Sequence, residues 1–449
     1  MGNQRNFALI AEEIVERAGN AGANLAEAYL LQAKELTIEV ANGAVETLKL
    51  AEDQGVGVRV FKGQRMGFAY SSDLSQQALE ETIRQALDNS EKTEKDQYNT
   101  MPTGDYNYPQ LDIFDAQIKQ VSIEDKIKLA KEIENVARAA DPRIKITETS
   151  AYSDSEYIVT IANSAGLKAS YQGTYCAAYA FIVAEENGDS QNGFGLQYAL
   201  KYSQINPETI GKEAAMKAVR MLGAKTIHTQ KTTIVLDPKV ATSFLGVLAP
   251  ALSADAVQKG KSLFAGKVGQ TVASPLLNIT DNGCLSGAVM SAPFDGEGVP
   301  TSETVLIKDG VLQGFLYNSY TAAKAGVKST GNGSRGSFKG TPEVGVTNFY
   351  IQAGQLSSTE LCKGVEQGLY ITEVLGMHTA NPISGDFSIG VSGLWLEKGV
   401  FTYPVRGVNV AGNLLELLSQ IQVVANDLEF IGSKGSPTIR IDGIMLSGH

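Results

Sequence analysis

Hydrophobic and polar positions at the start of the chain follow the order helix, strands, helix. Apolar residues recur at helical spacing over 7–18. Alternating positions around an Asn42-Gly43 turn then predict short strands at 28–40, 45–50, 55–61 and 66–70. A second helix is predicted over 74–87, so a first α-β(n)-α unit is expected within residues 1–100.

The same order returns over residues 101–223. Ser122 has the features of an N-cap for a helix that ends before Pro142. Strand patterns follow, and Asn206 with Pro207 begins another helix. The two units are therefore predicted to be a duplication of one α-β(n)-α arrangement.

Beyond residue 223 the pattern changes to short strands and tight turns. The clearest hairpin lies around Asp309-Gly310, between two apolar runs. Short helices are predicted among the strands, one of them over 414–424. Residues 224–449 are therefore predicted to form a β-rich domain with a few helices, and the whole chain to belong to the α+β class.

One helix of this domain carries almost no chemistry. Asp237 caps it, and Pro238 occupies the first helical position. No histidine, cysteine or acidic residue lies between Asp237 and Asp255. Pro250 lies inside the pattern, where its ring kinks or ends a helix. On its pattern alone, this is a plain core helix.

Composition and charge narrow the classes of function. The chain has 449 residues, 43% hydrophobic and 19% charged, which is typical of a globular protein with a large core. A net charge of -11 opposes non-specific binding to nucleic acid, which needs a basic surface. The N-terminus lacks the apolar core of a secretion signal, and no apolar run could span a bilayer. We therefore expect a cytoplasmic protein without direct nucleic-acid or membrane contact.

Candidate chemistry outside the blank helix is sparse. The three cysteines are widely separated, and each of the three histidines stands alone, so no metal-binding spacing is present. The glycine-rich run 331–336 lacks the strand–loop–helix order of a dinucleotide site. Arg335 within that run has a planar fork that suits a carboxylate or peptide carbonyl groups.

Two acidic groups permit further hypotheses. Asp295 and Glu297 flank a glycine, for which a solvated turn is the favoured interpretation and an acid–base pair the alternative. Ser388 follows Asp386 in the run SGDFS. A serine-hydrolase triad there is weakly supported, because no GxSxG elbow is present and no histidine lies near in sequence.

Four segments of the second half are distinctive when taken together. The longest, over 294–338, reads FDGEGVPTSETVLIKDGVLQGFLYNSYTAAKAGVKSTGNGSRGSF. The others are PISGDFSIGVSG at 382–393, AGNL at 411–414 and the ending at 439–448. In this order they resemble the TldD/PmbA family, also called the modulator of DNA gyrase or U62 peptidase family. With the N-terminal helix–sheet–helix layout, the resemblance covers essentially the whole chain.

The resemblance implies one of two branches. In the TldD branch a helix carries HExxxH, whose histidines bind zinc and whose glutamate is the general base, and a cysteine near the C-terminus completes the site. Counting back from KGKSLF at 259–264 places the two histidines on Leu245 and Pro250 and the glutamate on Gly246. Ser433 stands near the place of the cysteine. None of these side chains can ligate zinc as His or Cys does, so the chain resembles the PmbA branch, also called TldE.

The resemblance further implies a non-catalytic subunit with no cofactor of its own. Members of the two branches form a cytosolic hetero-oligomeric metallopeptidase that cleaves extended or unfolded peptides. A TldD-like partner would supply the zinc, and this chain would complete the chamber and hold the peptide by strand addition to a sheet edge. For peptide contact we single out Arg335, Asp386 and Ser388. Whether the isolated chain forms a homodimer stays open.

Two other hypotheses also stay open. An independent hydrolase would use Ser388 with Asp386, or Asp295 with Glu297. A modulator that binds gyrase-related protein partners would need none of these groups for catalysis. The acidic charge argues against DNA contact by such a modulator.

Overall fold

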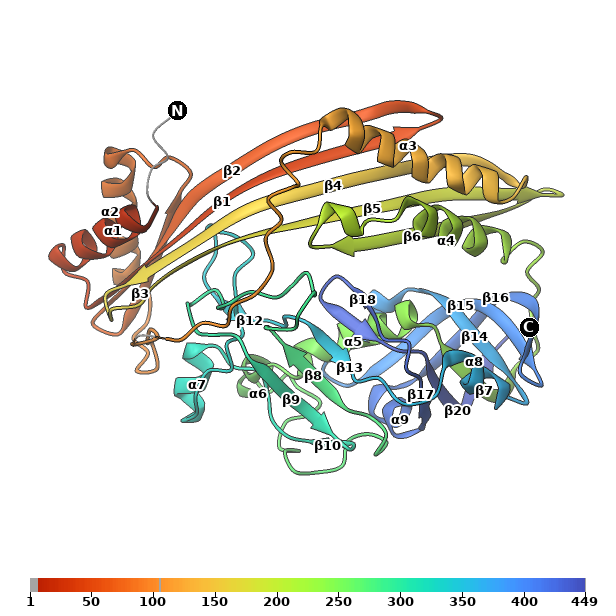
Figure 1. The fold of residues 1–449 in the computed structure, drawn as a ribbon. Coiled ribbons are helices and arrows are strands. Elements are labelled where there is room, and N and C mark those ends of the chain that lie inside the picture. The colour runs from red at the N-terminus through yellow and green to blue at the C-terminus, as the bar shows by residue number, and fades with distance from the viewer. Residues whose placement is uncertain (1–6, 105, 449) are drawn as a thin grey trace.

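The first half of the chain forms one long antiparallel sheet. The computed structural model describes residues 7–104 and 106–448. Six strands pair in the order β3-β2-β1-β4-β5-β6, and the sheet arches over the C-terminal half of the chain (Figure 1). The strands are β1 (Leu25–Ala41), β2 (Ala44–Lys62), β3 (Arg65–Ser71), β4 (Ile144–Asn163), β5 (Lys168–Glu186) and β6 (Asp189–Ala199).

The two units predicted from the sequence share this single sheet. β1 and β4 lie side by side at its centre and pair from Glu27 with Asn163 to Val40 with Ser150. The prediction of separate strands at 45–50 and 55–61 is wrong, because the residues between them continue the pairing with β1 and make β2 one strand.

Helices cover one face of the sheet at its two ends (Figure 1). They are α1 (Phe7–Asn20) and α2 (Gln76–Glu91) at one end, and α3 (Ile123–Ala140) and α4 (Pro207–Val219) at the other. Even-numbered residues of β1 within 26–30 join the core under α1 and α2, and those within 36–40 join the core under α3 and α4. Because side chains alternate along a strand, both helix pairs lie on the same face.

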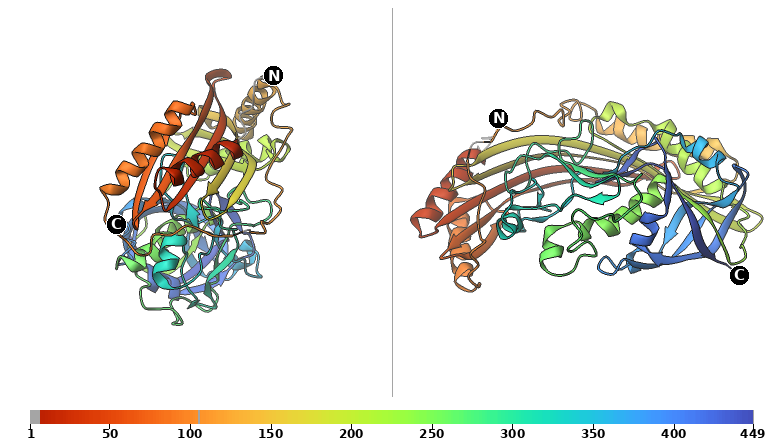
Figure 2. Two further views of the ribbon diagram at one scale, coloured as in Figure 1. Left: turned by 90° about the vertical axis from the view of Figure 1, so that its left-hand side faces the viewer. Right: turned by 90° about the horizontal axis from the view of Figure 1, so that it is seen from below.

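The opposite face of the sheet packs on the C-terminal half. Tyr29 and Leu31 of β1 point to this face and form an apolar cluster with Phe294 and Phe338. Figure 2 shows this half lying along the concave side of the arch. The alternation of one strand therefore divides the molecule into a helical layer, the sheet and the C-terminal half.

The C-terminal half contains two further six-stranded sheets. Their orders are β10-β9-β8-β13-β19-β18 and β16-β15-β14-β7-β20-β17, and β11 with β12 forms a small separate pair. The strands are β7 (Gln230–Leu236), β8 (Ile279–Asn282), β9 (Glu303–Lys308), β10 (Val311–Leu312), β11 (Gly333–Ser334), β12 (Glu343–Val344), β13 (Phe349–Ile351), β14 (Gln367–Leu375), β15 (Asp386–Glu397), β16 (Val400–Asn413), β17 (Ile421–Val424), β18 (Glu429–Ile431), β19 (Lys434–Ser436) and β20 (Ile439–Ser447). The helices are α5 (Pro238–Ala251), α6 (Ala254–Gln258), α7 (Ser319–Ala325), α8 (Ser358–Lys363) and α9 (Leu414–Ser419).

This arrangement confirms the α+β class but corrects one predicted helix. The helix expected over 414–424 ends at Ser419, and Ile421–Val424 forms β17 against β20. The β-branched residues of this short segment gain more from a sheet edge than from a further helical turn. Among the described residues, no helix has both the length and the apolar character needed to cross a membrane.

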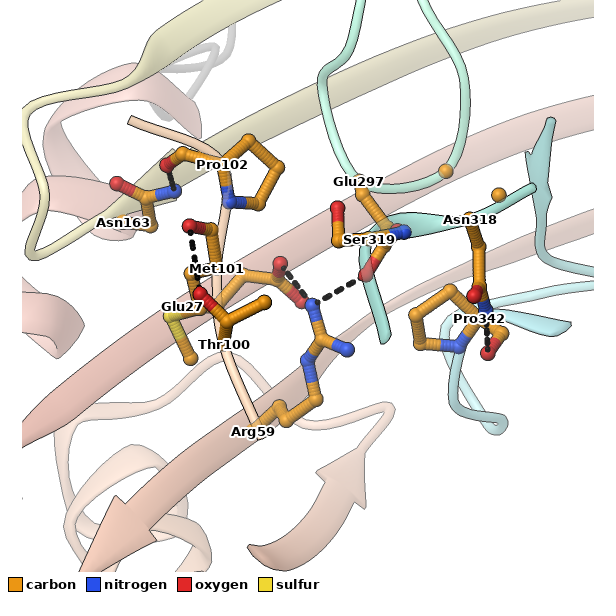
Figure 3. Close-up of polar contacts among 12 residues, drawn as sticks. Glu27, Arg59, Thr100, Met101, Pro102, Asn163, Glu297, Asn318, Ser319 and Pro342 are labelled. Atoms are coloured by element: carbon orange, nitrogen blue, oxygen red, sulfur yellow. Dashed lines mark hydrogen bonds and ion pairs between the residues drawn. The ribbon is translucent and has the colours of Figure 1, made fainter. Parts of the chain in front are cut away.

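Buried charges join the two halves of the chain. On β2, Arg59 Nη2 lies 2.7 Å from Glu27 Oε2 of β1 and 3.1 Å from Glu297 Oε1 of the C-terminal half (Figure 3). Arg335 contacts the other oxygen of Glu27, and all four side chains are at most 5% exposed. Burial opposes ionisation of Glu27, but the charges of Arg335 and Arg59 outweigh it and lower the pKa of this carboxyl.

We expect Arg335→Ala to lower the free energy of unfolding by about 3–5 kcal/mol, because the Glu27 carboxylate stays buried with one counter-charge fewer. Arg84→Ala is the matched control, since it removes an exposed guanidinium that pairs with Glu81 and should cost little. Urea unfolding followed through Trp395, the single tryptophan, measures both changes. Equal losses in the two variants would show that the network does not hold the halves together.

Candidate functional site

The helix predicted from Asp237 is α5, and it packs between strands of both large C-terminal sheets. Asp237 Oδ1 accepts a hydrogen bond of 3.1 Å from the backbone N–H of Lys239, and Pro238 occupies the first helical position. Pro250 is the last residue but one of α5, so the predicted stop is confirmed. The helix therefore places residues 245–250 at a fixed position in the C-terminal half.

The residues at the expected zinc-motif positions divide between the core and a cavity. The side chain of Leu245 is fully buried in the main core of the C-terminal half. Gly246 and Pro250 line a cavity of about 410 Å³. Ser433 directly precedes Lys434, which lines the same cavity. The carbonyl oxygen of Ser433 accepts a hydrogen bond from Phe349 N.

Zinc does not fit this cavity. A side chain on Gly246 would begin 3.6 Å from Lys434 Cε, so an ammonium-bearing chain occupies the place beside the missing glutamate. Lys434 Nζ lies 3.4 Å from Ser433 Oγ. Within the described residues, no group of three or more His, Cys, Asp or Glu side chains could hold a metal ion. Among the described residues of its lining, Asp255 is the one carboxylate and it pairs with Lys259, while no thiolate or imidazole is present, so a cavity that also holds a lysine disfavours a dication.

A larger cavity of about 670 Å³ continues from this one. The two cavities share Ser253, Asp255 and Val344, so together they form one groove. At its far end the groove is lined by Arg59 of β2 and by residues of the segment after α2. The groove therefore runs from α5 to the junction of the two halves, and we call it the α5 groove.

The walls of the α5 groove carry more acidic than basic side chains. The Tyr98 N–H and the Tyr320 hydroxyl donate to Asp96, and these hydrogen bonds lower the pKa of its carboxyl. Glu94 and Glu343 are further acids of the wall, and Asp255 pairs with Lys259 at 2.8 Å. A groove with this balance favours peptides that bring positive charge.

One wall of the α5 groove is the edge of a strand. β12 and the residues after it, Gly345 and Val346, line the two cavities. β12 pairs with β11 through Gly333 opposite Val344, and in the described part of the chain it has no strand on its other side. Backbone groups along such an edge can accept an extended peptide as an additional strand.

The structure separates the three residues singled out for peptide contact. Arg335 is not on the groove wall, because its side chain is buried and donates to Glu27 and to the carbonyl oxygen of Gly296. Asp386 and Ser388 are exposed at the start of β15. The hydrogen bond from Asn413 Nδ2 to Asp386 Oδ1, 3.0 Å long, lowers the pKa of that carboxyl.

The interpretation of Asp295 and Glu297 as a solvated turn is wrong. Both side chains are buried, at 9% and 0% exposure. Asp295 accepts three backbone hydrogen bonds, from Glu297, Val299 and Gly333, while Glu297 accepts from Arg59 and from the N–H of Ser319. Burial, and then the neighbouring Glu297 carboxylate, raise the pKa of Asp295 to about 7. The pair supports the junction of the two halves.

Sequence reasoning missed the groove residues themselves. Lys434 could have been predicted to line the groove, because it directly follows Ser433, which the family resemblance places near the expected zinc site. Asp255, Val344 and Arg59 carry no such signal, since they are far apart in sequence, and Arg59 joins the other two only when the two halves pack.

Comparison with known proteins gives the same family along nearly the whole chain. Residues 26–90 match the model of PmbA/TldA metallopeptidase domain 1, residues 117–222 the central domain and residues 229–448 the C-terminal domain. The metalloprotease PmbA of Escherichia coli O157:H7 is 30% identical over 427 residues, which cover 94% of this chain and 92% of that protein.

Two solved structures have the same fold. The putative modulator of a DNA gyrase from Thermotoga maritima aligns with a TM-score of 0.91 and 29% identity, covering 98% of this chain and 100% of that one. TldE from Thermococcus kodakarensis aligns with a TM-score of 0.89 and 21% identity, covering 98% and 100%. Together with the matched domains, these similarities show that the chain belongs to the PmbA/TldD metallopeptidase family.

Proposed function

We propose that this chain is a zinc-free, PmbA/TldE-like subunit of a cytoplasmic TldD/TldE-type peptidase. It holds an extended peptide in the α5 groove and leaves bond cleavage to a TldD-like subunit that carries HExxxH. One observation carries the proposal: Gly246 and Pro250 stand where the motif residues are expected, and with Lys434 they line a cavity whose described walls offer no imidazole or thiolate and a single carboxylate, that of Asp255.

The form of the groove supports peptide as the ligand. A peptide in the extended conformation would add along the edge of β12 and would place its side chains alternately toward α5 and away from it. The carboxylates of Glu94 and Glu343, which form no ion pair with a described residue, favour lysine or arginine in such a peptide. The chain would therefore select unfolded or extended segments, because a folded protein has no free backbone to offer.

The two alternative functions find less support. Asp386 accepts a hydrogen bond from Asn413, and Asp295 and Glu297 are buried in the junction of the two halves. None of these three acids is arranged to activate a nucleophile. A modulator that binds gyrase-related proteins would not need the cavity beside α5. The relative from Thermotoga maritima bears the modulator name, but that name describes that protein and by itself assigns no partner to this chain.

The purified chain is expected to contain zinc well below one ion per molecule and to leave unfolded peptides intact. Mixing it with a TldD-like subunit should give peptide cleavage that a chelator abolishes. Metal analysis by inductively coupled plasma mass spectrometry and a chromatographic peptide assay measure both quantities. Strong cleavage by this chain alone, insensitive to chelators, would contradict the proposal.

Filling the cavity beside α5 tests the groove directly. Gly246→Phe places a ring next to Lys434 and should weaken the binding of a labelled extended peptide to the two-subunit complex at least about tenfold, or ~1.4 kcal/mol. Fluorescence anisotropy of the labelled peptide measures the affinity.

Gly246→Ala is the matched control. Its methyl group meets Lys434 at an ordinary van der Waals distance, and replacing a helical glycine should raise stability by about 0.5–1 kcal/mol. Peptide affinity should stay unchanged in this variant. Equal affinities of the two variants would place the peptide outside the α5 groove.

A further inference from the structure

A separate cavity of about 300 Å³ lies between the other ends of the two halves. Its walls come from β5, β6 and α4 of the first half and from α5 and β14 of the C-terminal half, and it shares no lining residue with the α5 groove. Figure 1 shows α4 directly above this part of the C-terminal half. We call it the α4–α5 cavity.

Three half-buried cations line the α4–α5 cavity, namely Lys217, Arg220 and Lys239. Lys217 is paired with Glu213. Arg220 forms no side-chain hydrogen bond with any described residue, and its Nε is sealed from solvent without a partner. Burying an unpaired guanidinium costs free energy unless something accepts its hydrogen bonds.

Lys239 is likewise without a counter-charge in direct contact among the described residues. Its Nζ lies 5.0 Å from the ring centroid of Phe194, which attracts a cation only weakly. Burial, and then the charge of Lys217, lower the pKa of Lys239. Glu373, the acid among the described lining residues, is exposed to solvent, and it, Asp237 and Glu213 act on Lys239 through their charges without an ion-pair contact.

Hydroxyl and aromatic side chains complete the cavity wall. The N-terminal end of α5 adds no free positive pole there, because the Asp237 carboxylate caps it and accepts a hydrogen bond from the N–H of Lys239. Ser243 and Thr372 bring hydroxyl groups to the same cavity, and Phe181 with Phe194 forms an apolar wall. Among the described residues, Arg220 and Lys239 of this wall have no carboxylate in ion-pair contact, in a chain with a net charge of -11.

We propose that the α4–α5 cavity binds a compact oxyanion, the phosphate or carboxylate group of a small molecule. The two Nη groups of Arg220 would donate parallel hydrogen bonds to it, and Lys239 would neutralise its charge. Such a ligand contacts both halves of the chain and would stabilise their arrangement by mass action. The proposal does not depend on the role of the α5 groove.

Calorimetric titration of the full chain with sodium phosphate, AMP and succinate tests the proposal, with sodium chloride of equal ionic strength as the blank. We expect saturable binding of at least one of the three probes at one site per chain. Phosphate and AMP identify a phosphate group, and succinate a carboxylate. No saturable binding of any probe would overturn the proposal.

Substitutions assign the binding to the cavity. Arg220→Gln and Lys239→Gln should each weaken it by about tenfold or more, because each removes one charge-assisted contact. Lys328→Gln, at an exposed lysine far from this wall, makes the same change in net charge and should have no effect. Unchanged affinity in Arg220→Gln and Lys239→Gln would overturn the assignment.

Ser243→Glu provides a test that does not require loss of a cation. The new carboxylate would stand in for the ligand, so the Tm of the ligand-free protein should rise and the probes should no longer raise it. Differential scanning calorimetry measures both effects. A lowered Tm with unchanged binding of the probes would overturn the proposal.

Discussion

The structure depends on the buried charges of Glu27, Arg59, Glu297 and Arg335, because each half of the chain supplies one glutamate and one arginine. If the halves separated, Glu297 and Arg335 would lose the counter-charges that the first half supplies, and Glu27 and Arg59 would keep only each other. Removing one member of a buried pair is costly, while the intact pair contributes little beyond a hydrophobic alternative. The network therefore chiefly fixes the position of the first-half sheet on the C-terminal half.

The two cavities follow from this fixed arrangement. A curved sheet that meets its partner at a central junction leaves spaces on either side of it, one toward α5 and β12 and one between α4 and the start of α5. Arg59 belongs both to the network and to the wall of the α5 groove. The Nη2 of Arg59 contacts both Glu27 and Glu297. Figure 3 shows another nitrogen of the guanidinium directed toward Pro342.

Local signals in the sequence predicted most elements but few of the contacts between them. The Asp237 cap, the Asn42-Gly43 turn and the Asp309-Gly310 hairpin each act within a few residues, and the structure contains all three. Asp295 and Glu297 were misjudged because the arginine that binds Glu297 lies 238 residues away. Without that partner in view, two acids around a glycine have the pattern of an exposed turn.

The α5 groove likewise could not be predicted from local patterns in the sequence. Its strand edge, β12, has two residues, too few for an alternating pattern, so periodicity could not indicate it. The resemblance to the family did locate Gly246 and Pro250, because it compares positions and not patterns. It could not show that Leu245 lies in the core while its neighbour faces a cavity.

That difference between adjacent residues shows how α5 packs into the core at Leu245 while it faces the groove at Gly246. A helix turns about 100° per residue, so Leu245 and Gly246 face different surroundings. Leucine at the buried position adds apolar contacts to the core, whereas glycine at the facing position leaves an opening that Lys434 only partly fills. A glutamate at that position would meet the Lys434 side chain and narrow the groove. In the proposed function, Gly246 and Pro250 would stand in place of zinc-motif residues and leave room for a peptide backbone beside β12.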